Sequence, residues 1–289
     1  MSPARHAYQY ATNGRSGVER GREPIDPTLL APADGQLQRH AEVTRDRPVW
    51  AQDLLQVARA VFLADKLSLR AETDDRWTRR IDLSVQVAHA DVWTEVALTL
   101  LNRLTETLTA DRWTIRVHPG AAVWPQQDTL LATSRVEEAA LFSGGLDSSA
   151  YAAERSRASA GDLLLVSYYE PQWGTQQDRV LTAIRRSSPR DIWQFKASQQ
   201  VRAQHRELEP SARTRGLLYA ATAVYLAAAH EVPRVAVPKN GQLGLNPALT
   251  AARVAACSTR SVHPYTLSLL NELICALGGT VAVVNRTCS

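Results

Sequence analysis

The sequence predicts an α/β protein whose main part is a five-stranded parallel sheet, preceded by a small α+β unit. From residue 139 onward, short continuous apolar runs alternate with segments of helical periodicity. Strands that are apolar throughout are typical of parallel sheets buried on both faces, and strand–helix alternation favours right-handed crossovers. Before residue 120 the apolar residues follow two other patterns, that of a strand with one buried face and that of an amphipathic helix.

Each strand of the parallel sheet is expected to connect to the next through a helix. The strands fall on the apolar runs, at residues 139–142, 162–169, 192–195, 235–237 and 281–284. The helices fall at residues 150–155, 176–186, 217–229 and 267–277. In such a sheet, ligands bind beyond the carboxyl ends of the strands, near the point where the strand order reverses. Each loop that leaves a strand is therefore a candidate wall of a binding site.

The chain before this sheet divides into an arm and a small folded unit. Residues 1–45 are rich in glycine and proline and show no apolar periodicity, so we expect a disordered arm. The folded unit, at residues 46–133, is expected to contain a helix at 51–66, a strand at 81–87, a helix at 96–108 and a strand at 113–117. The parallel α/β domain then occupies residues 134–289.

Composition narrows the class of protein. The chain of 289 residues is 45% hydrophobic and 21% charged, which is typical of soluble globular proteins. It has no apolar run that could span a bilayer and no secretory signal, so we expect a cytoplasmic protein without a membrane partner. The net charge of +4 is dispersed, whereas nucleic-acid binding requires clustered charge, so nucleic acid is not an expected partner. The sequence leaves the oligomeric state open.

A serine- and glycine-rich turn joins the first strand of the parallel sheet to a helix. It reads Ser-Gly-Gly-Leu-Asp-Ser-Ser from Ser143 to Ser149. Two glycines allow a positive φ and a close approach of the backbone to a ligand, and the unpaired N–H groups of a helix start attract an anion. A phosphate is the expected ligand, and the serine hydroxyls add donors for it. Asp147 would repel a phosphate but suits a magnesium ion that bridges phosphates, and this combination indicates a nucleoside triphosphate.

We expect ATP to contact the run that extends from the end of the strand into the first helical turn. Its members are Leu141, Phe142, Ser143, Gly144, Gly145, Leu146, Asp147, Ser148 and Ser149. The alternative interpretation is an ordinary helix N-cap after a glycine turn, because serine and aspartate are favoured there in any case. No Walker A sequence, G-x-x-x-x-G-K-[ST], occurs in the chain.

Polar residues near the other strand exits extend the candidate site. Tyr168 ends the second strand and is expected to line an adenine pocket through its backbone groups, although an ordinary strand end is an equal alternative. Arg213 and Arg215 precede the helix at 217–229, where two guanidinium groups oppose the helix dipole. An anion at that helix start explains the two arginines better than folding alone does.

The last candidate residues follow the fourth strand and precede the last helix. The segment at 238–247 is rich in amide side chains that suit the edge of a heterocycle. For the segment at 258–264, a solvated loop with helix caps is an equal alternative to a substrate role. The candidate substrate contacts of the two segments are Lys239, Asn240, Asn246, Arg260 and His263.

Several runs of the chain together resemble a known family. They are residues 140–148, residues 209–216 (Glu-Pro-Ser-Ala-Arg-Thr-Arg-Gly), residues 238–241 (Pro-Lys-Asn-Gly), residues 245–250 and residues 258–265. The first run resembles the PP-loop signature S-G-G-x-D-S of the ATP pyrophosphatases. From Trp50 to the end, the order of features resembles the QatC family, the QueC-like proteins of Qat anti-phage systems. That family is similar to 7-cyano-7-deazaguanine synthase of queuosine biosynthesis.

The resemblance implies a fold of the PP-loop, adenine nucleotide alpha hydrolase-like type and an ATP-dependent ligase activity. In the synthase, ATP activates the carboxylate of 7-carboxy-7-deazaguanine, ammonia gives an amide, and a second activation dehydrates the amide to a nitrile. By resemblance, the loop holds ATP, Asp147 holds Mg²⁺, and Arg213 and Arg215 lie near phosphate or the substrate carboxylate as catalytic groups. The implied partners are a deazaguanine substrate and other proteins of the same defence system.

One departure from the family concerns zinc. The synthase carries a C-terminal site of four cysteines, whereas Cys257, Cys275 and Cys288 are scattered, without C-x-x-C spacing, and indicate neither that site nor a disulfide framework. Either the chain is a truncated form, or this branch folds without the metal.

Three functions therefore stay open. The first is a ligase that transfers an adenylated deazaguanine carboxylate to ammonia or to a protein amine. The second is a non-catalytic nucleotide-binding subunit of a defence complex. The third is another PP-loop chemistry such as tRNA modification by thiolation, which usually needs a reactive cysteine near the loop.

Overall fold

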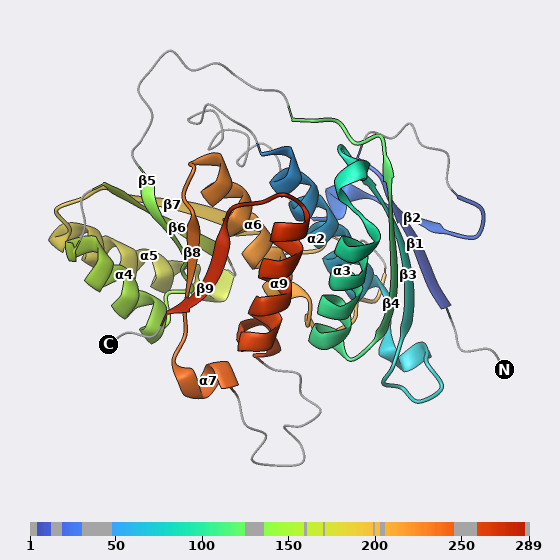
Figure 1. Cartoon of the computed structure of the whole chain (residues 1–289). Helices are drawn as coiled ribbons and strands as arrows, with labels where there is room; N and C mark the ends of the chain where they lie inside the picture. The colour runs from blue at the N-terminus through green and yellow to red at the C-terminus, as the bar shows by residue number, and fades with distance from the viewer. Residues whose placement is uncertain are drawn as a thin grey trace.

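Two parallel sheets lie on either side of a layer of helices in the computed structural model (Figure 1). The structure describes residues 5–12, 19–30, 48–124, 136–158, 161–169, 171–198, 200–202, 206–245 and 259–286. The first sheet has the strand order β2-β1-β3-β4 and the second the order β7-β6-β5-β8-β9. Neighbouring strands are parallel throughout both sheets. The predicted α/β class and the five-stranded parallel sheet are thus confirmed.

The helices and strands follow the predicted order from residue 49 onward. The strands are β1 Arg5–Tyr10, β2 Glu23–Ile25, β3 Arg80–Val87, β4 Arg112–Pro119, β5 Val136–Leu141, β6 Asp162–Tyr169, β7 Ile192–Ser198, β8 Arg234–Pro238 and β9 Ala282–Arg286. The α-helices are α2 Val49–Leu67, α3 Glu95–Thr109, α4 Leu146–Ala158, α5 Pro171–Ser187, α6 Arg215–Ala229, α7 Gly241–Leu245 and α9 Pro264–Ala276. Short 3-10 helices include η2 Arg70–Glu72 and η4 Arg260–Val262. None of the described helices is long and apolar enough to cross a membrane.

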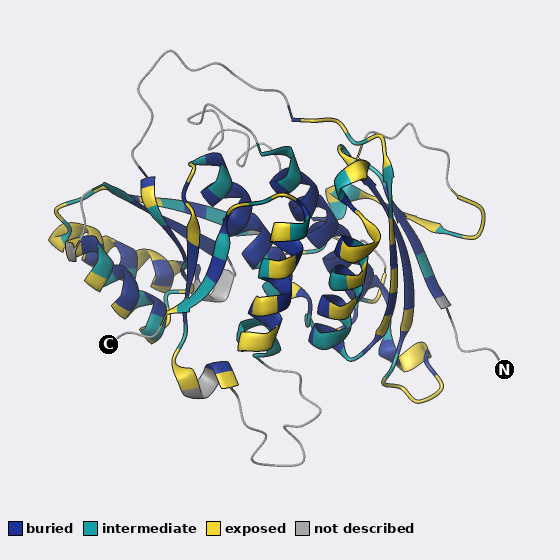
Figure 2. Ribbon diagram, in the orientation of Figure 1, coloured by how far each residue is buried: buried dark blue, intermediate teal, exposed yellow. Residues whose placement is uncertain are grey.

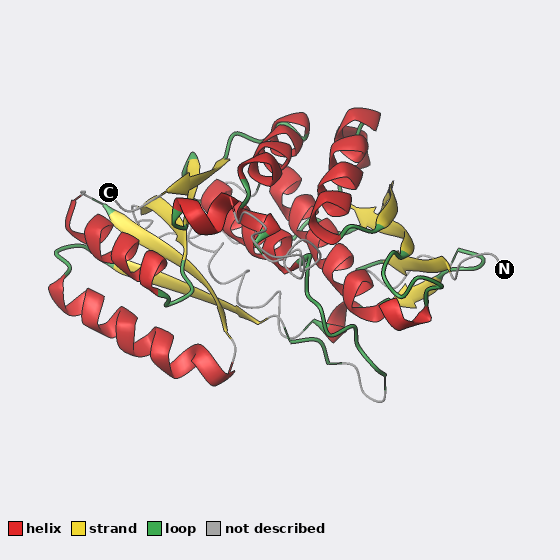
Figure 3. Cartoon of the chain, turned by 90° about the horizontal axis from the view of Figure 1, so that it is seen from below, coloured by secondary structure: helices red, strands yellow, loops and turns green. Residues whose placement is uncertain are grey.

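The five-stranded sheet reverses its strand order between β5 and β8. Helices α4 and α5 cover one face of this sheet, and α6 and α9 lie on the other (Figures 1 and 3). This arrangement is that of a doubly wound sheet, in which the crevice beside the reversal point is the usual ligand site. The loop after β5 begins at that point.

The helical layer joins the two sheets through one hydrophobic core. Helix α2 packs against α6, and α3 packs against α9. The core cluster extends from β1, β3 and β4 through these helices to β5, β8 and β9, and the central helices are dark with buried residues in Figure 2. A second, smaller cluster lies under α4 and α5. The domain boundary predicted at residues 133–134 lies outside the described residues.

The prediction of a disordered arm over residues 1–45 is wrong for Arg5–Tyr10 and Glu23–Ile25, which form β1 and β2. Strand β1 pairs with β2 on one side and with β3 on the other. Tyr8 and Tyr10 are each only 2% exposed. Their hydroxyls donate to the Leu67 carbonyl and to Gln56 Oε1, each at 3.1 Å. The burial of two aromatic side chains explains why this segment is ordered despite its glycine- and proline-rich surroundings.

A buried ion network connects the N-terminal unit to the start of α6. The guanidinium of Arg79, 0% exposed, donates to the carboxylates of Asp65 at 2.6 Å and Asp111 at 2.5 Å. Asp65 also accepts the N–H of Thr214 at 3.2 Å and its hydroxyl at 2.8 Å, directly before α6. Arg70 holds Asp111 through two bonds of 2.8 Å. Burial raises the pKa of Asp111, but the hydrogen bonds and charges of Arg79 and Arg70 outweigh it and hold the pKa below its usual value.

Replacing Arg79 with methionine should strongly destabilise the protein. The change leaves Asp65 and Asp111 buried without their shared counter-charge, so we expect the free energy of unfolding to fall by about 3–5 kcal/mol in urea denaturation. The matched control is Arg80→Met, at the exposed neighbouring arginine, which should change it by less than about 0.5 kcal/mol. Equal effects of the two substitutions would contradict the network's role.

Acid should weaken the same network. The pKa of Asp111 is lower in the folded chain than in the unfolded chain, so its contribution is fully present above the unfolded value of about 3.9 and is lost as the pH falls through the folded value. We expect the free energy of unfolding to decline below about pH 4, and Asp111→Asn to make this decline shallower. Urea denaturation between neutral and acidic pH measures both slopes. An unchanged slope in the variant would show that Asp111 does not titrate with unfolding.

Candidate functional site

The glycine loop lies at the carboxyl end of β5, beside the reversal point of the sheet. Strand β5 ends at Leu141, and α4 begins at Leu146. Gly144 has a φ of +75°, in the left-handed region that favours glycine. A Cβ added there would lie 2.7 Å from Cγ and 3.1 Å from Cα of Gln177 in α5. Both the backbone conformation and the close approach of α5 therefore require glycine at this position.

The two serines at the ends of the loop bond to each other and to the turn between them. Ser148 is 4% exposed, and its hydroxyl accepts the Ser143 N–H at 3.3 Å and donates to the Gly145 carbonyl at 3.1 Å. Ser143 Oγ lies 3.1 Å from Ser148 Oγ and accepts the Gly145 N–H at 3.3 Å. The Ser148 hydroxyl, expected to face a phosphate, thus stabilises the turn.

Some backbone N–H groups of the loop are not used in hydrogen bonds within the described part of the chain. Among the described residues, the N–H groups of Gly144, Leu146 and Ser148 donate no hydrogen bond. The Leu146 side chain is 85% exposed, whereas Phe142 is 2% exposed and packs into the core under α4 and α5. Unpaired N–H groups at the start of a helix form an anion site. The loop therefore offers its backbone, more than its side chains, to a ligand.

The loops after β5 and β8 meet across the reversal point. Asp147, in the first turn of α4, accepts the N–H of Asn240 at 3.3 Å. The neighbouring Lys239 N–H donates to the Arg286 carbonyl at the end of β9, at 3.3 Å. Two residues predicted separately, Asp147 and Asn240, are therefore in contact. Asn246 lies outside the described residues.

Arg213 and Arg260 both bind the end of α3. Arg213 Nη1 donates to the Thr109 carbonyl at 2.5 Å, and its guanidinium lies 4.5 Å from the centroid of the Trp77 ring. Arg260 Nη1 donates to the Thr107 carbonyl at 3.0 Å. Carbonyl groups at a helix C-terminus attract cations, so these contacts stabilise the packing of α3. The predicted roles of Arg213 and Arg260 toward a ligand stay predictions.

The start of α6 already has an anion of its own. The Asp65 carboxylate accepts both donors of Thr214, so a carboxylate of the fold itself lies at the helix start beside Arg213 and Arg215, and the ligand anion expected there stays a prediction. Arg215 is exposed and lies 5.7 Å from the centroid of the Tyr219 ring.

Tyr168 and His263 both make contacts with other residues of the chain. The Tyr168 ring stacks on Tyr219 with centroids 3.5 Å apart, and its hydroxyl donates to the Leu218 carbonyl at 3.0 Å. Burial raises the pKa of Tyr168. Its backbone carbonyl, expected near adenine, accepts Gln177 Nε2 at 3.4 Å. His263 is the N-cap of α9, where its Nδ1 accepts the Tyr265 N–H at 3.2 Å.

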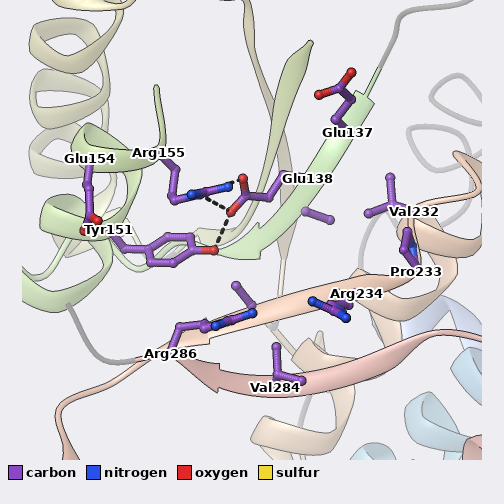
Figure 4. Close-up of a pocket in the computed structure, with 12 residues that line it drawn as sticks. Glu137, Glu138, Tyr151, Glu154, Arg155, Val232, Pro233, Arg234, Val284 and Arg286 are labelled. Carbon is purple, nitrogen blue, oxygen red and sulfur yellow. Dashed lines mark hydrogen bonds and ion pairs between the residues drawn. The ribbon is translucent and has the colours of Figure 1, made fainter. Parts of the chain in front are cut away.

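A cavity of about 510 Å³ lies on the α4 side of β5, β8 and β9 (Figure 4). No residue of the glycine loop lines it. Glu138 accepts Arg155 Nε at 2.9 and 3.0 Å and also accepts the Tyr151 hydroxyl, while Arg234 and Arg286 reach toward the cavity from β8 and β9. Burial and the hydrogen bond to Glu138 raise the pKa of Tyr151. The residues that line the cavity come from separate elements and share no sequence pattern, so the sequence does not predict it.

The described residues contain no group of three or more His, Cys, Asp or Glu that could hold a metal, and Cys257 and Cys288 lie outside them.

No family model matches the chain, and no curated protein matches it. A ketoreductase domain from the bacillaene assembly line is similar at a TM-score of 0.31 and 8% identity, over 93% of this chain and 83% of that one. Such a TM-score carries no argument about function.

Alanine at Gly144 should disturb the loop far more than alanine at Gly145. Gly144→Ala combines a positive φ with a Cβ too close to Gln177, so we expect a loss of about 1–3 kcal/mol in the free energy of unfolding. In Gly145→Ala the added Cβ meets only Ser143 Oγ, at 3.4 Å, and we expect a loss below about 1 kcal/mol. Urea denaturation of both variants tests the difference. Equal losses would mean that the left-handed turn does not constrain Gly144.

Proposed function

We propose that the chain binds the triphosphate of ATP at the glycine loop, as a PP-loop protein of the adenine nucleotide alpha hydrolase-like type. The observation that carries this proposal is the set of unpaired loop N–H groups at the start of α4, beside the reversal point of a parallel sheet. Helix starts at that place in a doubly wound sheet are suited to phosphate groups. The S-G-G-x-D-S resemblance of residues 143–148 supports the choice of ATP.

Asp147 is the residue that would hold Mg²⁺ with the bound nucleotide. Its carboxylate lies in the first turn of α4, at the carboxyl edge of the sheet, and accepts the N–H of Asn240. Mg²⁺ is commonly bound through one or two carboxylates together with substrate phosphates, so the residues present fit the ion. When bound, the ion would neutralise charge on the phosphates.

The proposed reaction is adenylation of a 7-deazaguanine carboxylate, such as that of 7-carboxy-7-deazaguanine. A carboxylate oxygen attacks the α-phosphorus, the bond to pyrophosphate breaks, and a nitrogen nucleophile then displaces AMP from the acyl adenylate. The nucleophile is ammonia or a protein amine. This step rests on the resemblance to 7-cyano-7-deazaguanine synthase and to the QatC family, which also supports a role in anti-phage defence with protein partners.

In the proposed reaction, residues from two other segments have different roles. Helix α6 leads into β8, so its N-terminus and the exposed Arg215 lie toward the carboxyl edge of the sheet, where charge develops on the leaving pyrophosphate. Lys239 and Asn240 follow β8 at the same edge, and we propose that they contact the deazaguanine. Chemistry in this arrangement depends on positioning and on charge stabilisation.

A pyrophosphate-release assay with 7-carboxy-7-deazaguanine, ammonia and Mg²⁺ tests the proposal. The native chain should release pyrophosphate, and Asp147→Ala should lower the rate by about 10²-fold because the phosphate charge is less well neutralised. The matched control is Glu95→Ala, which removes a carboxylate from the first turn of α3 and should leave the rate unchanged. Equal rates for the native chain and Asp147→Ala would contradict the metal role of Asp147.

Calorimetry separates the proposal from its alternatives. Tight Mg²⁺-dependent ATP binding without pyrophosphate release would favour a non-catalytic nucleotide-binding subunit of a defence complex. Release that requires a tRNA in place of the deazaguanine would favour another PP-loop chemistry. No ATP binding by the folded chain would reject the nucleotide site itself.

A further inference from the structure

A buried glutamine contacts the glycine loop from α5. Gln177 is 4% exposed, and its Nε2 donates to the Ser143 carbonyl at 2.9 Å and to the Tyr168 carbonyl at 3.4 Å. Both neighbours are acceptors, so the amide nitrogen, and not the oxygen, must face them. The Gln177 side chain therefore joins the loop after β5 to the end of β6 through its donor group alone.

This contact determines which way one peptide group of the loop points. The Ser143–Gly144 peptide is trans, as no described peptide bond is cis, so the Ser143 carbonyl and the Gly144 N–H point in opposite directions. Gln177 holds the carbonyl toward α5. The Gly144 N–H is thereby directed away from α5, and among the described residues it has no partner.

The opposite orientation of this peptide would spoil an anion site. Gly144 adopts a left-handed φ and has no side chain, so the peptide before it is free to rotate more easily than its neighbours. A rotated peptide would present the Ser143 carbonyl oxygen where the Gly144 N–H now lies, and that oxygen would repel a phosphate. The Gln177 donor on the α5 side opposes this rotation.

We propose that Gln177 is a positioning residue that holds the Ser143–Gly144 peptide in its phosphate-binding orientation. The inference rests on the proposed function, since the anion it serves is the pyrophosphate part of ATP. We expect Gln177 to orient the peptide group and not to stabilise the fold, because Gln177 Oε1 is buried without a hydrogen-bond partner among the described residues. A buried unpaired acceptor destabilises a fold, so its removal in an apolar side chain of similar length should offset the loss of the two donor bonds to the Ser143 and Tyr168 carbonyls.

The test compares Gln177→Met with Gln176→Met, the same substitution at the exposed preceding residue. We measure the affinity for Mg²⁺-pyrophosphate by calorimetry, the melting temperature, and the KM values for ATP and for 7-carboxy-7-deazaguanine. Gln177→Met should bind pyrophosphate roughly ten- to hundredfold more weakly, as expected for losing a charge-assisted hydrogen bond. Its KM for ATP should rise while the KM for the carboxylate and the melting temperature stay unchanged. Gln176→Met should match the native chain in every measurement.

Each other outcome overturns the inference in a distinguishable way. If the native chain binds pyrophosphate and Gln177→Met binds it equally well, Gln177 does not orient the loop. If Gln177→Met and a second variant, Gln177→Leu, both melt at markedly lower temperature, the residue serves folding. If both KM values rise together, the whole site is distorted. If the native chain binds neither ATP nor pyrophosphate, the proposed function fails and this inference fails with it.

Discussion

The pairing of Arg79 with Asp65 is the interaction on which the position of the candidate site depends. Arg79 and Asp65 both belong to the N-terminal unit, Asp65 in the last turn of α2, and the same Asp65 carboxylate binds Thr214 at the start of α6. Helix α6 covers the five-stranded sheet and leads into β8, whose exit loop meets Asp147. Loss of one partner would leave a buried charge uncompensated, so this network constrains where α6 begins. The N-terminal unit thus helps to position the site without contributing a residue that we place in it.

At the glycine loop, the constraints come from the backbone. Gly144 must be left-handed, α5 leaves no room for a Cβ, and the hydroxyls of Ser143 and Ser148 bond within the turn. What has no partner among the described residues is a set of N–H groups. An anion site built from backbone dipoles is preorganised, because the groups need no further ordering when the ligand arrives. A single peptide rotation would reverse one of these dipoles, and this is the reason for the positioning role that we propose for Gln177.

The parts of this structure that were predictable from sequence are those with a local signal. Continuous apolar runs identified β5, β6 and β8, and helical periodicity identified α2 and α3, because these patterns depend only on which face is buried. Strand β1 was missed since its alternating Tyr8 and Tyr10 stand beside glycine- and proline-rich segments. Asp147 and Asn240 were both predicted to follow strands of one parallel sheet, whose carboxyl ends share an edge, and the two residues are in contact there. The partners of Arg213 and Arg260 did not, because the end of α3 is distant from both in sequence.

The contacts of the arginines decide where positive charge is available for a reaction. Arg213 and Arg260 donate hydrogen bonds to carbonyls at the end of α3. Moving either guanidinium group toward a phosphate would leave its carbonyl without this donor. Arg215 is exposed beside Tyr219, and Lys239 lies beside Asn240 across from Asp147. Stabilisation of a leaving pyrophosphate would then fall mainly to the loop N–H groups, a magnesium ion at Asp147, and these two side chains. A site of this kind depends on the geometry of its backbone more than on a dense cluster of cations. The orientation of the Ser143–Gly144 peptide would therefore strongly affect phosphate binding.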